Sequence, residues 1–261
     1  ADGLTALNLA IPIYNFISGS GLMIGMGGGT KYSIQKSLGD RNAANRTFTN
    51  AFFLVAAFAM FFVLVGIFFS GSIVAAFGAE GNVFEMSRTY LQVILLFSPA
   101  FLMNNLQLCF IRNDGAPQLA MAAMITGSLS NVVLDWVFIF PCQMGIFGAV
   151  FATGLAPIIS MAVLSSHFIK GKNQFRLVLS RPHKKTMTGI VTSGVPSLVT
   201  ELSSGIVIII FNAIILKLEG NTGVAAYGVI ANLSLVVTAI YTGIAQGIQR
   251  VCAFPYFGGH M

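Results

Sequence analysis

The chain has 261 residues, of which 56% are hydrophobic and only 8% are charged. Soluble proteins carry about 25% charged residues, so this composition excludes a soluble enzyme, a disordered chain and a nucleic-acid-binding domain. A membrane protein remains. Its net charge of +6 indicates orientation in the bilayer rather than an anionic partner, because Lys and Arg stay in cytoplasmic loops.

Seven stretches reach the length of about 20 mostly apolar residues that a transmembrane helix needs. None alternates in polarity over about ten residues, as a membrane β-barrel strand does. We therefore predict an all-α polytopic membrane protein. The seven predicted spans are Ala6–Ile34, Phe48–Phe77, Tyr90–Ile111, Leu119–Phe140, Phe147–Ile169, Ile190–Leu216 and Ala225–Ile248.

The joints between the spans alternate in charge, and twelve of the 14 basic residues fall on one side. The positive-inside rule predicts that this side is cytoplasmic. The first span then enters from outside, which leads us to expect a preceding helix. The twelve residues are Lys31, Lys36, Arg41, Arg46, Arg112, Lys170, Lys172, Arg176, Arg181, Lys184, Lys185 and Arg250.

An internal echo supports a repeat architecture, because a shift of 219 residues overlays the first predicted span on the seventh. The offset holds six helices, which predicts two six-helix halves of like orientation, a known transporter plan. We expect an amino-terminal lobe at 1–172 that lacks its first helix, a cytoplasmic linker at 173–188 and the start of a carboxy-terminal lobe at 189–261. The matching pairs are Ala6 with Ala225, Gly28 with Gly247, Lys31 with Arg250 and Gly39 with Gly258.

Small residues and prolines inside the spans have structural interpretations. The glycines Gly21, Gly25 and Gly29 form a small-xxx-small stripe, which predicts close helix packing. Each proline inside a span removes a backbone hydrogen bond and favours a kink. These prolines are Pro99, Pro157 and Pro196.

The cysteines and histidines predict neither a disulfide framework nor a cofactor. The His167 and His183 side chains flank the long basic loop, where we expect them to be solvated. The three cysteines are widely spaced and form no CxxC pair, so they show no metal signature. They are Cys109, Cys142 and Cys252.

Two carboxylates stand inside predicted spans, Asp135 in the fourth and Glu201 in the sixth. A charge at mid-membrane costs at least ~2.5 kcal/mol, so such groups are usually functional and face the protein interior. Asn131 shares a helix face with Asp135, and Thr153 follows in the next span. Carboxylate, amide and hydroxyl oxygens together suit a small hard cation, or a proton on the carboxylate. A protonated or hydrogen-bonded structural acid is the alternative.

Several motifs in order resemble the multidrug and toxic compound extrusion (MATE) transporters, over nearly the whole chain. Each motif is weak alone, whereas the ordered set at family spacing is highly specific. One departure is Trp136, where the family usually has Pro. The motifs are GDRNAANR at 39–46, RNDGAP at 112–117, NVVLD at 131–135 with FIF at 138–140, GAVFAT at 148–153, GVP at 194–196 and AQG at 245–247.

The resemblance implies family helices two to eight of twelve, from a fold of two six-helix lobes around a central cavity. It implies a monomeric multi-pass transporter of the cell membrane that exports cationic drugs in exchange for Na⁺ or H⁺, with no other cofactor. Asn131, Asp135 and Thr153 match the family's amino-terminal cation site, which also uses an acid from a first helix that this chain lacks. Glu201 is a further candidate for coupling or substrate binding.

Three alternatives stay open on the sequence. A lipid-linked oligosaccharide flippase of the same superfamily has similar helices, but usually lines its cavity with basic residues. An intramembrane transferase needs clustered acidic motifs, whereas Asp135 is alone in its span. The third alternative is that the 261 residues alone are an inactive fragment of a transporter.

Overall fold

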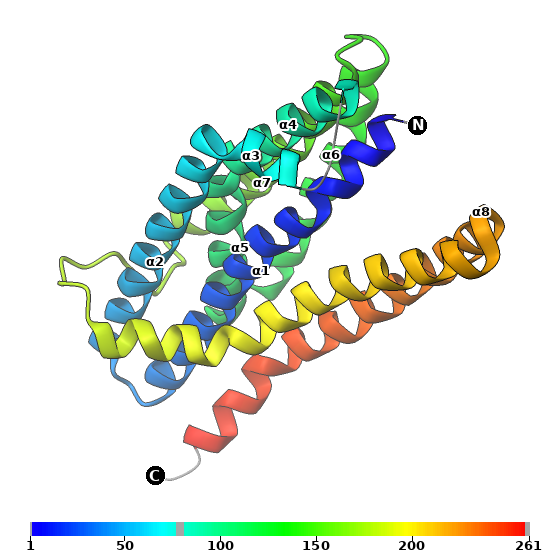
Figure 1. Cartoon of the computed structure of the whole chain (residues 1–261). Coiled ribbons are helices and arrows are strands. Elements are labelled where there is room, and N and C mark those ends of the chain that lie inside the picture. The colour runs from blue at the N-terminus through cyan, green and yellow to red at the C-terminus, as the bar shows by residue number, and fades with distance from the viewer. Residues whose placement is uncertain (1, 77–80, 259–261) are drawn as a thin grey trace.

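The computed structural model describes the backbone of residues 2–76 and 81–258, with most side chains between residues 10 and 211 and fewer beyond. Every regular element in those ranges is a helix, which confirms the all-α prediction. Figure 1 shows the helices, which in chain order are α1 Asp2–Ser37, α2 Arg41–Phe68, α3 Ser70–Ala76, α4 Gly81–Leu96, α5 Ser98–Asn113, α6 Pro117–Ile139, α7 Gly145–Ile169 and α8 Lys184–Gly258.

The outer surface of the bundle is apolar, and many polar side chains lie inside. Met60 and Val132 are each 66% exposed, whereas Asn50 and Asn113 are almost fully buried. This distribution suits a lipid environment, where apolar side chains face the hydrocarbon and polar ones need partners inside the protein. Among the described helices, four are long and apolar enough to cross a membrane, or five if the bent pair α4–α5 forms one span.

The structure divides two predicted spans and joins two others. The stretch Phe48–Phe77 contains the end of α2 and the short α3, which are separated at Phe69. The stretch Tyr90–Ile111 contains the junction of α4 and α5, which are bent by 44°. Pro99 stands in the first turn of α5, where its missing N–H favours a break, whereas Pro157 lies inside the continuous α7. The sixth and seventh spans both lie in α8, whose ribbon turns back on itself in Figure 1.

The glycines of α1 determine how closely α5 approaches. A Cβ added at Gly25 would lie 2.9 Å from the carbonyl oxygen of Asn105 and 2.9 Å from the Cys109 sulfur. Gly21 and Gly29 face the same helix in the same way. The predicted packing role of this stripe is therefore confirmed.

A second close contact joins α1 to the first arm of α8. Gly27 lies against the carbonyl group of Ile190, and Gly194 lies against the carbonyl group of Met23. A side chain on either glycine would collide with the backbone of the other helix. These two positions therefore bring together the helices that the sequence assigns to different lobes.

The segment from 172 to 183 has no regular structure and crosses the end of the bundle between α7 and α8. Phe175 anchors this segment, because it is fully buried among aromatic rings. Its ring centroid lies 4.6 Å from that of Phe48 and 5.7 Å from that of Phe110. Since α8 begins at Lys184, the helix starts inside the predicted linker.

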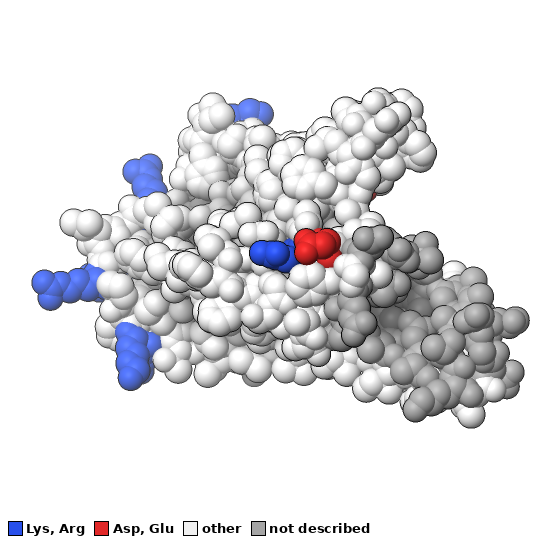
Figure 2. Space-filling model, turned by 45° about the horizontal axis from the view of Figure 1, so that its top comes forward, with Lys and Arg blue, Asp and Glu red and all other residues white. Residues whose placement is uncertain are grey.

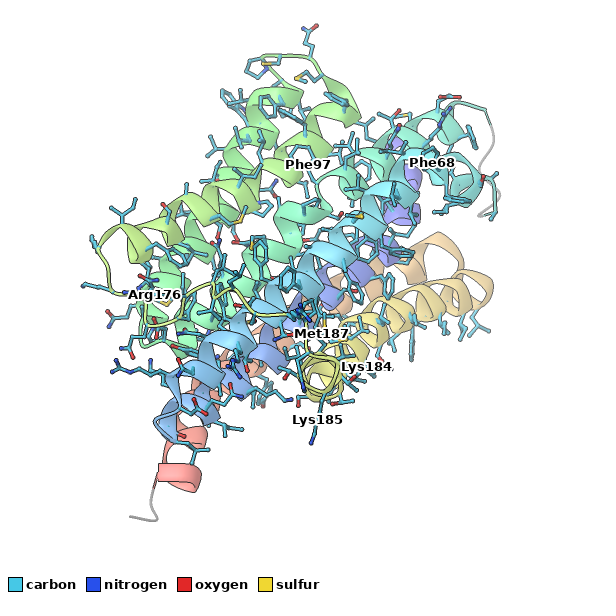
Figure 3. All side chains as sticks on the ribbon, turned by 90° about the vertical axis from the view of Figure 1, so that its left-hand side faces the viewer. Phe68, Phe97, Arg176, Lys184, Lys185 and Met187 are labelled. Atoms are coloured by element: carbon cyan, nitrogen blue, oxygen red, sulfur yellow. The ribbon has the colours of Figure 1, made fainter. Side chains whose placement is uncertain are left out.

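Basic side chains gather at this same end, as the alternating joints predicted. Figure 2 shows several of them toward the left-hand end of the molecule. In Figure 3, Arg176, Lys184 and Lys185 lie far from Phe68 at the opposite end of α2. The side chain of Arg250 lies outside the described residues. The structure therefore shows which end of the bundle carries most of the positive charge. That this end faces the cytoplasm remains a prediction.

Candidate functional site

The antiparallel pair α6–α7 brings the predicted cation-site residues together. A short turn after α6 sends α7 back along it, and the two helices pack tightly at Gly127, where an added Cβ would lie 3.1 Å from the Ser160 Cβ. Between this contact and the turn, α6 carries Asn131 and Asp135 one helical turn apart, and α7 carries Thr153. The local sequence thus places an amide, a carboxylate and a hydroxyl along one helix pair.

A cavity of about 300 Å³ opens beside Asn131 and Thr153. Asp135 is one turn further along α6 and is not among the residues that line this cavity. The structure therefore brings two of the three predicted residues to one cavity and places the third next to it. The other polar residues of the lining come from α1, α5, α6 and α7, and they are Tyr14, Ser18, Asn104, Asn105, Ser128 and Ser160.

Two tyrosines lie near Thr153. The Tyr90 side chain of α4 interacts with Thr153 and electrostatically with Asp135. Tyr14 and Tyr90 also line, with Thr153, a second cavity of about 190 Å³. Neither tyrosine was predicted as a site residue, because a lone tyrosine in an apolar helix fits a packed core equally well. Its polar hydroxyl, which needs a partner when buried, was the only available signal.

The oxygen atom Oδ1 of Asp135 is buried and has no hydrogen-bond partner. Asn131 Nδ2 and Asn104 Oδ1 are in the same situation. A buried polar atom without a partner costs about 1–3 kcal/mol of stability. These atoms therefore favour the binding of an ion or another polar ligand. Oxygen donors from Asp135, Asn131 and Thr153 have the chemistry that hard cations prefer. Because these three residues supply a single carboxylate, they fit a monovalent cation or a proton better than a divalent metal.

Glu201 lies at a different interface, between α8 and α1. Its Cβ is 3.1 Å from the position that a Cβ on Gly19 of α1 would take, and it interacts electrostatically with Tyr14. The neighbouring Asn15 of α1 packs against Gly205 of α8. Glu201 therefore does not join the other three predicted residues. Tyr14 connects the two places, because it faces Glu201 and also lines both cavities near Thr153.

A third buried carboxylate, Asp114, follows the end of α5 at the basic end of the bundle. It accepts hydrogen bonds from Tyr32 Oη at 2.6 Å and from the backbone N–H of Gln174 at 2.8 Å. It also pairs with Lys36 Nζ at 2.7 Å and His167 Nε2 at 3.0 Å. Burial alone would raise the pKa of Asp114, but the hydrogen bonds from Lys36, Tyr32, His167 and Gln174 hold that pKa below its ordinary value.

This cluster corrects one expectation from the sequence. His167 was predicted to be solvated, but its side chain is only 3% exposed and packs against Asp114. His183 is exposed, as predicted. Cys109 is buried and Cys142 is exposed, and both are free, while the Cys252 side chain lies outside the described residues. Among the described side chains, no group of three or more His, Cys, Asp or Glu could hold a metal.

Comparison with known proteins assigns the family. The MatE family model matches residues 1–137, more than half of the chain. The chain therefore belongs to the MatE family of multidrug and toxic compound extrusion transporters, as its motifs predicted. It is 25% identical to the multidrug export protein MepA of Staphylococcus aureus, and 25% identical to MepA of Staphylococcus saprophyticus. Each match covers 97% of this chain and 56% of the relative, so the chain spans little more than half the length of these relatives.

Solved structures show the same fold. An outward-facing MATE multidrug resistance transporter superimposes with a TM-score of 0.91 at 23% identity, over 99% of this chain and 58% of the other. An inward-facing one gives 0.79 at 23% identity, over 97% and 57%. A transporter of the wider superfamily from Pyrococcus furiosus, described as having a binding pocket of reverse polarity, gives 0.87 at 23% identity, over 99% and 58%. The chain is thus a multi-pass membrane protein with a transporter fold.

Proposed function

We propose that the complete protein is a secondary active antiporter, which exports organic cations or drugs in exchange for Na⁺ or H⁺. The observation that carries this proposal is the carboxylate of Asp135, with a buried and unpartnered oxygen beside Asn131 and Thr153. A group of this kind inside a span binds and releases a small cation at low cost, because ligand binding replaces a missing partner. The family membership and the MepA relatives support an efflux role.

The proposed coupling ion binds at Asp135, with Asn131 and Thr153 as further oxygen ligands. Binding neutralises the carboxylate and satisfies its free oxygen. Tyr90, which interacts with both Thr153 and Asp135, then adjusts the packing of α4 against α7. The lobes rock between outward-facing and inward-facing states, and the affinity for the drug falls. Glu201, at the contact of α1 with α8, is proposed to respond to the same rocking movement.

The polarity of the interior supports a cationic cargo. Asp135 and Glu201 are the carboxylates that the sequence places within spans. Asp135 has a buried oxygen without a partner, and Glu201 lies at the contact of α8 with α1. A flippase for a lipid-linked pyrophosphate needs positive charge at the corresponding place. We further propose a monomer in the cell membrane with the basic end in the cytoplasm, in keeping with the positive-inside rule.

Because the chain covers 56% of the MepA relatives, the transport activity is proposed for the whole protein. We expect the 261 residues alone to supply one lobe and only the start of the second, whereas alternating access requires both lobes. We expect them to insert into proteoliposomes and to give no gradient-driven efflux. Ion-driven drug export by this chain alone would contradict that expectation.

The test of the coupling role compares two Asp→Asn variants in the complete transporter. Asp135→Asn removes the negative charge at the candidate site, whereas Asp40→Asn changes an exposed N-cap residue of α2, where Asn caps equally well. We expect Asp135→Asn to abolish dye efflux driven by a Na⁺ or pH gradient, and Asp40→Asn to leave it intact. Separate Na⁺ and pH gradients identify the ion. Efflux by Asp135→Asn equal to that of the unmodified protein would refute the coupling role.

A further inference from the structure

A larger cavity, of about 650 Å³, lies at the basic end of the bundle, away from the candidate cation site. It opens where the segment 172–183 passes the first turns of α2 and reaches the start of α8. These elements meet on the left of Figure 1. Its principal polar lining consists of Arg46, Asn50, Ser180, Arg181, His183 and Thr186.

The wall of this cavity is fixed by hydrogen bonds from the linker backbone to side chains of α2. The N–H of Arg176 donates to Asn45 Oδ1 at 2.9 Å. The N–H of His183 donates to Asn50 Oδ1 at 2.8 Å. Because α2 accepts from the linker backbone at Arg176 and at His183, these bonds hold the lining residues 178–181 of the linker against α2.

The charge of the described side chains that line the cavity is positive. Arg46 and Arg181 both line it, and the lining contains no carboxylate. The ion pairs found among the described residues are both at Asp114. The nearby Asp40 is engaged as the N-cap of α2, accepting from the N–H of Ala43 at 2.9 Å. Two guanidinium groups without acidic partners favour an anion.

Further donors suit an anion with several oxygens. Ser180 Oγ is buried and has no hydrogen-bond partner. The first turn of α8 reaches the lining at Thr186, which brings the positive end of that helix to the cavity, whereas the N-terminus of α2 is already capped by Asp40. A phosphate group offers the charge and the acceptor oxygens that these donors require.

The surroundings favour a phosphate attached to a lipid. On the same linker, Leu177 is 58% exposed and Leu179 is fully exposed. Lys184 and Lys185 are exposed at the start of α8, as Figure 3 shows. Exposed leucines beside clustered basic residues, at the end of an apolar helix bundle, are typical of a segment at the membrane surface.

We propose that this cavity binds the phosphate of an anionic phospholipid headgroup from the membrane leaflet at the basic end. Arg46 and Arg181 contact the phosphate oxygens, and Ser180 donates its hydroxyl. The leucines of the linker lie beside the acyl chains. The bound lipid connects α2 with the start of α8, so it stabilises the folded chain in proportion to its occupancy.

The experiment uses the whole 261-residue chain, purified in neutral detergent. Thermal unfolding and native mass spectrometry are recorded with phosphatidylglycerol, with phosphatidylcholine, and with inorganic phosphate. The test variant carries Arg46→Gln and Arg181→Gln. The matched control carries Arg41→Gln and Arg176→Gln, which remove the same charge from the same two elements outside the cavity lining.

We expect phosphatidylglycerol to raise the unfolding temperature and to remain bound, and the cavity variant to bind it at least about tenfold more weakly. The control variant retains binding. Equal loss in the two variants would overturn the proposal in favour of general charge attraction. Stabilisation by inorganic phosphate with none by the lipid would overturn the lipid as the source. If the double variant fails to fold, Ser180→Ala replaces it, and unchanged lipid affinity in that variant contradicts the assigned donor.

Discussion

The surroundings of Asp114 and Asp135 show two ways of keeping a carboxylate inside one helix bundle. Asp114 has four partners, from Tyr32, Lys36, His167 and Gln174. Asp135, in contrast, has a buried oxygen without any. The protein supplies all the partners of the Asp114 carboxylate, whereas the Asp135 carboxylate remains available to bind a proton or a cation.

This difference separates a structural acid from a candidate for ion coupling. At Asp114, the charge is used to join the ends of α1, α5 and α7 to the linker. A group held by so many contacts changes state only if those contacts break. At Asp135, a proton or cation supplies the partner that the buried oxygen lacks. Its binding and release therefore require little rearrangement of the protein.

The largest expected effect on stability comes from removing the satisfied acid. Asp114→Ala leaves the buried His167 and the Lys36 ammonium without their partner, so we expect a loss of about 3–5 kcal/mol in the free energy of unfolding. Denaturant titration of the purified chain in detergent measures it. Asp40→Ala, which removes only the N-cap of α2, serves as control and should cost about 1 kcal/mol. Equal losses would contradict the structural role of Asp114.

Two tyrosines allow the same comparison without removing a charge. Tyr32→Phe deletes a hydrogen bond to the Asp114 carboxylate, and we expect a cost of about 1.5–3 kcal/mol. Tyr90→Phe removes a hydroxyl that interacts with the neutral side chain of Thr153, with an expected cost of about 0.5–1.5 kcal/mol. In the complete transporter, Tyr90→Phe should weaken ion-driven efflux more than its stability loss accounts for. The reverse ranking of the two stability losses would argue against the distinction.

The glycine stripe of α1 predicts a smaller effect on the free energy of unfolding, and its packing against α5 gives the sign. Gly25→Ala inserts a methyl group 2.9 Å from the Asn105 carbonyl oxygen, so we expect a destabilisation of about 1–3 kcal/mol. Gly243→Ala is the matched control, because its added Cβ meets nothing within 4 Å, and helix propensity then favours alanine. Thermal unfolding of both variants measures the difference. A stabilising Gly25→Ala would mean that α1 and α5 are less tightly packed.

The smallest expected effect is on how steeply the free energy of unfolding falls at acid pH. The pKa of Asp114 in the folded state lies below its ordinary value of 3.8. The ionised form therefore contributes stability above pH 3.8, and this contribution is lost as the pH falls through the lowered pKa. Below pH 3.8, Asp114→Asn should show a shallower fall in unfolding free energy than the unmodified chain. Parallel curves would show that Asp114 does not carry this pH dependence.

The sequence predicted the candidate site better than its surroundings. The i, i+4 spacing of Asn131 and Asp135 and the short turn before Thr153 are local, so their proximity follows from helix geometry. The cluster at Asp114 depends on partners 53 to 82 residues away, which no local pattern reveals. His167 was wrongly expected to be solvated for the same reason.

The ends of the helices were also only partly predictable. Apolar composition alone does not locate the break at Phe69 between α2 and α3. The local signal for it is the run of small residues Ser70, Gly71 and Ser72 that directly follows. The bend between α4 and α5 was foreseeable from Pro99, because proline removes a backbone donor. Pro157, in contrast, lies inside the continuous α7, so a proline favours a bend and tertiary packing decides whether the helix breaks.

The most direct test of the contrast pairs Asp114→Asn with Asp135→Asn in the complete transporter, measuring both the free energy of unfolding and gradient-driven efflux. We predict that Asp114→Asn loses stability. We predict that Asp135→Asn keeps its stability within about 1 kcal/mol and loses ion-driven efflux. An Asp135→Asn variant that is strongly destabilised, with the efflux of its folded fraction unchanged, would contradict the account.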